Sequence, residues 1–126
     1  MKEPIWVETE DCVAFHAEML ARFGGLDGIR DHNMLQSSLF RARQLHANSP
    51  ASMPELAASY ATGIIKNRPF LDGNKRTGFL CAAFFLEING LHFHAPEVEV
   101  VERTLALAAA AIKESDYALW LKRSCD

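Results

Sequence analysis

The residues best suited to chemistry are gathered in one short segment, residues 66–76, which reads KNRPFLDGNKR. Its four basic side chains and one acidic side chain give it a net charge of +3, whereas the whole chain carries −3. The remaining residues therefore carry −6 between them. A cationic cluster inside an acidic chain indicates an anionic ligand at one place rather than general nucleic-acid binding.

The backbone of this segment is also suited to holding an anion. Pro69 prevents a preceding helix from running on, and Gly73 allows a tight turn whose N–H groups face one point. We expect a helix to begin at Asn74, where free N–H groups and the positive end of the helix dipole favour phosphate. The segment therefore predicts a phosphate-binding loop followed by a helix.

Three side chains of the segment can complete such a phosphate site. Arg76 can bind two phosphate oxygens at once, and Lys75 adds a point charge. Asp72 is the only carboxylate of the segment, and a carboxylate beside phosphates is suited to hold Mg²⁺. Phe70 is expected to point into the core and fix the loop. The alternative from composition alone is a loop of solvated charges beside a capped helix.

The elements that must position this segment are helices. Apolar residues recur at helical spacing along almost the whole chain, which predicts an all-α fold of about six helices. Capping residues and helix breakers predict starts after Thr9, Asp31 and Ser52, an end at Gly24, and further starts at Asn74, Pro96 and Ser115. The buried faces are expected to include Val13, Ala17, Leu20 and Ala21 in the first helix and Val98, Val101, Leu105, Ala108 and Ile112 in the fifth.

The bulk composition predicts one compact domain over residues 1–126. Hydrophobic residues make up 49% and charged residues 23%, which excludes intrinsic disorder. Residues 79–86 are apolar on every side, so a helix over residues 74–89 is expected to be the central, buried one. No stretch is apolar enough for a bilayer span or a signal peptide, so we expect a cytoplasmic protein without a membrane partner.

Residues 68–76, RPFLDGNKR, resemble the signature of the Fic/Doc superfamily, His-x-Phe-x-(Asp/Glu)-x-Asn-x-Arg. Lys75 resembles the death-on-curing branch, Doc, whose members are toxins of type II toxin–antitoxin modules. Nucleotidyl-transferring Fic enzymes usually have glycine there and often a second arginine three residues after the first, where this chain has Phe79. The link GGLDGIRD, residues 24–31, and the order of the helices also resemble a Doc toxin.

The resemblance implies a compact Fic/Doc helical fold and transfer of the γ-phosphoryl group of ATP to a threonine of elongation factor Tu, which blocks translation and arrests growth. By position, Asp72 would bind Mg²⁺ and Arg76 would clamp the phosphates. Asn74 and the N–H groups around Gly73 would hold a phosphate oxygen. Lys75 would hinder the nucleotide pose of nucleotidyl transferases. The implied partner is a cognate Phd-like antitoxin whose C-terminal segment folds into a groove, and direct DNA binding is not expected.

The chain departs from the signature at its first position, where Arg68 replaces the histidine regarded as the general base. Histidine titrates near neutrality and can accept a hydroxyl proton, whereas arginine stays protonated and has no acceptor. No other histidine is expected to replace it, since the others lie elsewhere in the predicted fold: His16, His32, His46, His92 and His94. We therefore expect an inactive or impaired toxin, through a substitution that was introduced, selected or natural. The alternatives are a Fic-type AMP transferase and a non-catalytic protein that binds a nucleotide or an antitoxin.

Overall fold

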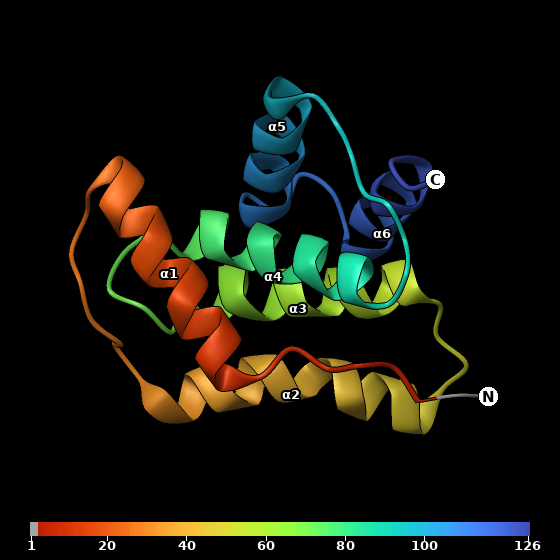
Figure 1. Ribbon diagram of the computed structural model, residues 1–126, viewed down its shortest axis with the longest axis horizontal. Helices are drawn as coiled ribbons and strands as arrows, with labels where there is room; N and C mark the ends of the chain where they lie inside the picture. Colours follow the sequence, from red (N-terminus) through yellow and green to blue (C-terminus); the bar gives the residue numbers. More distant parts are fainter. Residues whose placement is uncertain (1–2) are drawn as a thin grey trace.

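The computed structural model describes residues 3–126, and these residues form six helices and no β-strand beyond two isolated bridges (Figure 1). In chain order the helices are α1 (Thr9–Phe23), α2 (His32–Asn48), α3 (Met53–Asn67), α4 (Asn74–Ile88), α5 (Glu97–Ala108) and α6 (Glu114–Arg123). The predicted all-α class and the number of helices are confirmed. Across this part of the chain, no helix combines the length and the apolar character that crossing a bilayer requires.

The centre of the fold is α3. Ten of its 15 residues are buried, and α2, α4 and α6 all pack against it. Figure 1 shows it between α2 and α4. The predicted central helix over residues 74–89 is therefore a neighbour of the centre, because α4 leaves Phe79 and Leu80 only half-buried. The small residues of α3 explain its place, since they let three helices approach its backbone closely.

Two glycines mark the closest contacts of α3 with its neighbours. A Cβ atom at Gly63 would lie 2.8 Å from the carbonyl oxygen of Ser38 in α2. A Cβ atom at Gly78 in α4 would lie 2.9 Å from Cγ1 of Ile65 in α3. Larger residues would force these helices apart. The two contacts therefore set how closely α3 lies against α2 and α4.

The first helix, α1, packs across α4 but buries a different face from the predicted one. Its buried residues are Cys12, His16 and Met19. Of the predicted face, Leu20 is half-buried and the others are exposed: Val13, Ala17 and Ala21. His16 was not among the residues predicted to be buried, whereas its ring has partners inside the fold. The helix ends at Gly24 as predicted, while its N-cap is Glu8 rather than Thr9.

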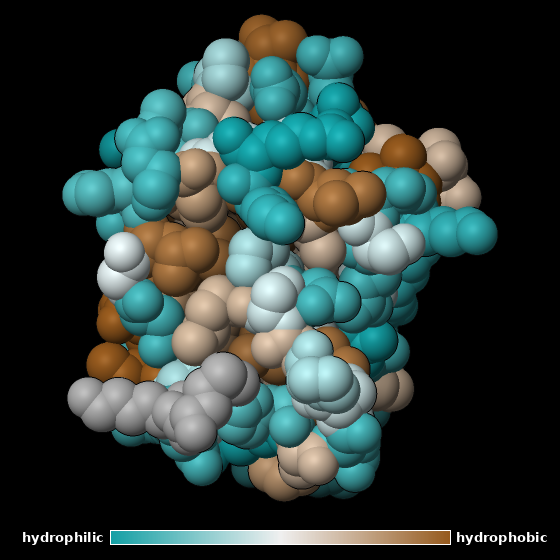
Figure 2. Space-filling model, turned by 90° about the vertical axis from the view of Figure 1, so that its right-hand side faces the viewer, coloured by the Kyte–Doolittle hydropathy of each residue, from teal (hydrophilic) through white to brown (hydrophobic). Residues whose placement is uncertain are grey.

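The fifth helix, α5, also differs from the sequence prediction. Its buried residues are Thr104 and Leu107. Three residues predicted to be buried are exposed, namely Val98, Val101 and Leu105, and Ala108 and Ile112 are half-buried. The apolar stripe is real, but no element of residues 3–126 covers it completely. On the face seen in Figure 2, hydrophobic side chains likewise occur in separate patches among hydrophilic ones.

The helix caps that position the motif segment were predicted well. The Asp31 side chain accepts the N–H of Met34 at 3.0 Å and opens α2. Ser52 and Glu55 form the expected capping box at the start of α3. The last helix starts at Glu114, before the predicted cap Ser115. The predicted end of α3 at Pro69 and the start of α4 at Asn74 leave a short connection between them, residues 68–73.

Candidate functional site

The predicted phosphate-binding loop is this connection, residues 68–73. Arg68 ends α3 in a left-handed conformation, with φ 51° and ψ 58°. Pro69 and Phe70 are buried, and Gly73 takes φ 76° and ψ 14° directly before α4. A residue in the left-handed conformation therefore stands at each end of the loop. Gly73 adopts this conformation without strain because it has no side chain. The chain turns sharply there and presents the first N–H groups of α4 beside the loop.

The link between α1 and α2 runs along the loop and holds its backbone. The N–H groups of Arg30 and Asp31 donate to the carbonyl oxygen of Pro69 at 2.7 and 3.1 Å. The N–H of Leu71 donates in the opposite direction, to the carbonyl oxygen of Gly28 at 3.0 Å. The link and the loop are therefore paired like two short antiparallel strands.

The side chain of Arg30 fixes the start of the loop. Its Nε donates to the carbonyl oxygen of Arg68 at 2.7 Å, and its Nη2 donates to that of Asn67 at 2.7 Å. The two bonds satisfy carbonyl groups at the end of α3 that have no partner within the helix. The link GGLDGIRD is therefore a structural part of the candidate site, a role that the sequence alone did not predict.

Asn74 and Phe70 hold the loop together from within. The N–H of Phe70 donates to Oδ1 of Asn74 at 3.0 Å, and Nδ2 of Asn74 donates to the carbonyl oxygen of Phe70 at 3.0 Å. The Phe70 side chain is 1% exposed, as predicted. Because both polar atoms of the Asn74 side chain are used, that side chain braces the loop. In this geometry Asn74 can therefore contact a phosphate only through its main-chain N–H.

Asp72 lies at the exposed tip of the loop. Its Oδ1 accepts the N–H of Gly73 at 2.9 Å, and its Oδ2 accepts the N–H of Leu26 at 3.3 Å. Residues 3–126 hold no cluster of three or more metal-ligating side chains. A single exposed carboxylate fits Mg²⁺ better than Zn²⁺ or Ca²⁺, because Mg²⁺ is commonly held by one or two carboxylates, substrate phosphates and water.

The four basic side chains of the segment are all exposed: Lys66, Arg68, Lys75 and Arg76. The ion pairs found in residues 3–126 join other groups, and none includes one of these four. Arg76 instead lies over the ring of Phe23 in α1, with Cζ 3.9 Å from the ring centroid. Such stacking leaves the N–H groups at the guanidinium edge free to donate. The positive charge of the segment is therefore available to an anion.

His16 of α1 is the site residue that the sequence prediction missed. It was expected to lie apart from the loop, but its ring stacks on Phe70 with a centroid distance of 3.9 Å. Its Nε2–H donates to the carbonyl oxygen of Asp72 at 2.8 Å. The packing of α1 on α4 brings together residues that are 56 positions apart in the sequence. His92 and His94 follow the other end of α4, as predicted.

A groove of about 640 Å³ opens beside the loop. The end of α1, the start of α4, residues 93–95 and α5 line it, and we call it the α1–α4–α5 groove. Its apolar lining includes Phe79, Leu80, Val101 and Leu105, and its basic lining consists of Arg22, Lys75 and Arg76. The groove is therefore apolar along α5 and positively charged where it meets the loop.

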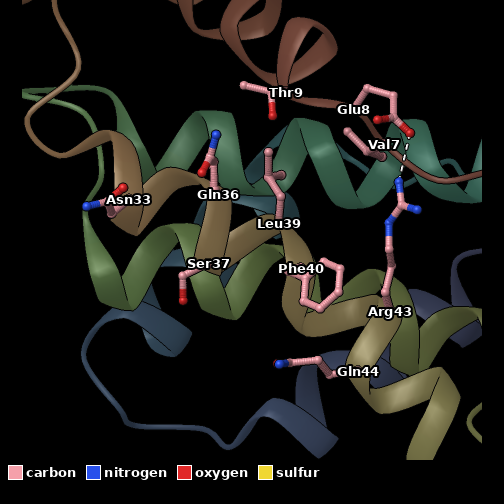
Figure 3. A pocket seen from close by; sticks show the side chains of 10 residues that line it. All are labelled: Val7, Glu8, Thr9, Asn33, Gln36, Ser37, Leu39, Phe40, Arg43 and Gln44. Atoms are coloured by element: carbon pink, nitrogen blue, oxygen red, sulfur yellow. Dashed lines mark hydrogen bonds and ion pairs between the residues drawn. The ribbon is translucent and has the colours of Figure 1, made fainter.

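A second groove, of about 610 Å³, lies between the N-terminal segment and the outer face of α2 (Figure 3). The side chains of Gln36 and Phe40 line it, and an ion pair between Arg43 and Glu8, 2.8 Å long, spans one end. None of residues 66–76 takes part in its lining. This groove is separate from the candidate site.

The chain is similar to known proteins over most of its length. Residues 6–86 match the profile of the Fic/DOC family. The chain is 29% identical over 119 residues to "Protein kinase doc" of Escherichia phage P1, and the match covers 93% of each chain. It is 34% identical over 76 residues to "Toxin Doc" of Mycolicibacterium smegmatis, and that match covers 58% of each chain. The residues matched by the family profile include the whole loop, residues 68–73.

Proposed function

The chain belongs to the Fic/DOC family, and on this premise we propose that it is a Doc-type toxin built to transfer the γ-phosphoryl group of ATP to a threonine of elongation factor Tu. The observation that carries the proposal is the loop before α4, where exposed basic side chains take part in no ion pair within the described residues. One relative is named a protein kinase and the other a toxin. Phosphoryl transfer requires positioning and charge neutralisation, which such a loop can supply.

The proposal gives each side chain of the loop one task. The Asp72 carboxylate would hold Mg²⁺ beside the phosphates, and the metal would neutralise part of their charge. The N–H groups at the start of α4 would bind phosphate oxygens, with Arg76 and Lys75 adding positive charge. During transfer, the bond from the threonine oxygen to the γ-phosphorus forms and the bond to the bridging oxygen breaks. ADP leaves, and the hydroxyl proton passes to a base.

That base is the group we propose this chain lacks. Arg68 stands at the position of the signature histidine and cannot accept a proton. Its left-handed backbone is one that histidine adopts more readily than most non-glycine residues, so the position suits the family residue. We propose that His16 does not substitute, since its Nε2 already carries a proton that it donates to Asp72 and its side chain, including the unprotonated Nδ1, is only 3% exposed. The chain is therefore proposed to bind ATP but to transfer its phosphoryl group poorly.

The test is the single substitution Arg68→His, with Arg68→Gln as its matched control. Both variants remove the arginine charge, but only histidine supplies a base near neutral pH. We expect Arg68→His to arrest growth and to add the mass of one phosphoryl group to elongation factor Tu in the presence of ATP. Arg68→Gln should do neither. The acceptor residue can be identified by mass spectrometry of the modified peptide.

Other outcomes of the same experiment identify the alternative functions. If Arg68→His adds a nucleotide instead of a phosphoryl group, the protein is an AMP transferase. If it binds ATP and modifies nothing, the protein is a non-catalytic binding module, the reading that Arg68 itself favours. Lys75 and Phe79, which stand where nucleotidyl transferases usually have glycine and a second arginine, argue for phosphoryl transfer.

We further propose that a Phd-like antitoxin occupies the α1–α4–α5 groove with its C-terminal segment. An amphipathic helix can lay its apolar face along such a groove, and the basic end suits an acidic segment of the partner. The substitution Val101→Glu should weaken binding of the cognate antitoxin at least tenfold, because it puts a charge on the apolar wall. Val98→Glu is the matched control, since Val98 is exposed on the same helix but does not line the groove. Equal effects of the two substitutions would place the partner elsewhere.

A further inference from the structure

His16 contacts the phosphate-binding loop at three points. Its ring lies flat on Phe70, with 9° between the ring planes. Its Nε2–H donates to the carbonyl oxygen of Asp72. A Cβ atom at Gly73 would lie 3.5 Å from its Cδ2, so the ring also packs against the backbone of Gly73. We infer that His16 is a positioning residue, which fixes the peptide unit before α4 and thereby sets the affinity of the loop for the phosphates of ATP.

The hydrogen bond to Asp72 defines the state of the imidazole ring. A carbonyl oxygen can only accept, so the proton of the neutral ring must be on Nε2. That nitrogen points at the loop backbone, and the side chain is 3% exposed. In this tautomer Nε2 cannot accept a proton, and the unprotonated Nδ1 belongs to a side chain that is almost fully buried. His16 acts through Asp72 and Phe70, and this separates its role from that of the missing base at Arg68.

The peptide unit that His16 holds lies directly before the N–H groups of α4 from which the anion site would be built, and its own N–H, that of Gly73, donates to Oδ1 of Asp72. The carbonyl group of Asp72 belongs to the peptide bond with Gly73, and α4 starts at the next residue, Asn74. An anion site made of main-chain N–H groups depends on their pointing to one place. Rotation of this unit would spread those N–H groups and would also move the Asp72 carboxylate. The loop can hold its shape for phosphate only if the unit is fixed.

The other contacts of the loop do not replace this one. Asn74 braces the loop at Phe70, and the link from α1 to α2 pairs with Pro69 and Leu71. Both sets of bonds hold the backbone at residues 69–71, and the bonds at Asp72 itself, from the N–H groups of Gly73 and Leu26, go to its exposed carboxylate rather than to its carbonyl oxygen. The carbonyl oxygen of Asp72 accepts its bond from His16 alone among the described residues. Helix α1 therefore holds the end of the loop that adjoins α4.

The test uses the full chain with Arg68 unchanged and measures the dissociation constant for ATP with Mg²⁺. His16→Phe keeps the stacking on Phe70 but removes the donor to Asp72, and we expect ATP to bind ~5-fold more weakly, as for the loss of one hydrogen bond. His16→Gln retains an N–H donor at the same distance along the side chain, and it should recover most of the affinity. Cys12→Ala is the matched control, because Cys12 is buried on α1 one turn earlier and has no contact with the loop in the hydrogen-bond pattern.

The outcomes separate this inference from the proposed function. If His16→Phe and Cys12→Ala lower the melting temperature alike and neither changes ATP affinity, His16 is a core residue only, and the inference is wrong. If the unsubstituted chain binds no ATP, the proposed function fails, and the effect of His16 on the loop must be measured without a ligand. Hydrogen exchange at the N–H groups of Phe70 and Thr77 then decides. His16→Phe should speed exchange at both, and Cys12→Ala at neither; unchanged exchange would overturn the inference.

Discussion

Replacing Gly25 with alanine tests the contact between the α1–α2 link and the candidate metal ligand. Gly25 has a φ of 123°, which residues with a side chain rarely adopt, and an added Cβ atom would lie 2.8 Å from Oδ2 of Asp72. It would also lie 3.1 Å from Cδ2 of Leu20. The same Oδ2 accepts the N–H of Leu26 at 3.3 Å. The new methyl group must therefore displace the Asp72 carboxylate and break that bond.

The expected loss of stability has two parts. The left-handed backbone at residue 25 would cost alanine about 1–3 kcal/mol. The displaced hydrogen bond is long and exposed, and its loss adds about 0.5–1 kcal/mol. Gly24→Ala is the matched control, since Gly24 has a φ of 76° but no atom within 4 Å of an added Cβ. Gly24→Ala should therefore lose stability through the strained backbone alone, without the loss of the hydrogen bond between Asp72 and Leu26.

The assay is urea unfolding of both variants, together with the NMR signal of the Leu26 N–H. Both variants should have a lower free energy of unfolding, with Gly25→Ala lower by the greater amount. Only Gly25→Ala should shift the Leu26 signal, because only that variant moves the carboxylate. A Gly25→Ala variant as stable as the original chain would refute the left-handed conformation of the link. Equal Leu26 signals in both variants would refute its contact with Asp72.

The remaining predictions concern the metal site, the α3–α4 contact and the start of α3. Asp72→Asn should reduce the gain in ATP affinity that Mg²⁺ gives by ~10-fold or more, measured by titration with and without the metal. Gly78→Ala should lower the free energy of unfolding by about 1–3 kcal/mol, since its Cβ would lie 2.9 Å from Ile65 Cγ1; thermal unfolding measures it, and an unchanged melting temperature would contradict the close contact. Hydrogen bonds from the backbone and then the side chain of Ser52 lower the pKa of Glu55 from its usual 4.5, so they stabilise the fold only while the carboxylate is ionised. Glu55→Gln should therefore be about 0.3–1 kcal/mol less stable near neutral pH, and the difference should vanish as the pH falls through the lowered pKa of Glu55, below 4.5.

The sequence predicted the local features of this protein because they are encoded within a few residues. Asp31 and Ser52 cap their helices through side chains that reach only three positions ahead. Pro69 and Gly73 delimit the loop through their own backbone preferences. The start of α4 at Asn74 and the burial of Phe70 follow from the same segment. These features, together with helical periodicity, were enough to predict the fold class and the position of the loop.

The predictions that were wrong concern features that depend on contacts between distant segments. His16 shares a stripe with Cys12 and Met19 at helical spacing, which could have identified the buried face of α1. The stripe was missed because a histidine is buried only when it finds a polar partner, and that partner, Asp72, is far away in the sequence. Val101 in α5 shows the opposite error, because an apolar stripe has the same sequence pattern whether it faces a core or an open groove.

The α1–α4–α5 groove has a consequence for the solubility of the free chain. Its apolar wall includes Val101 and Leu105, whose side chains are exposed to solvent when no partner fills the groove. A ligand that binds only the folded chain raises the free energy of unfolding by about 2.7 kcal/mol when the free ligand concentration is a hundred times the dissociation constant. Without such a molecule, exposed apolar surface favours contact between copies of the chain. We therefore expect the yield and melting temperature of this protein to rise when a segment that fills the groove is produced with it.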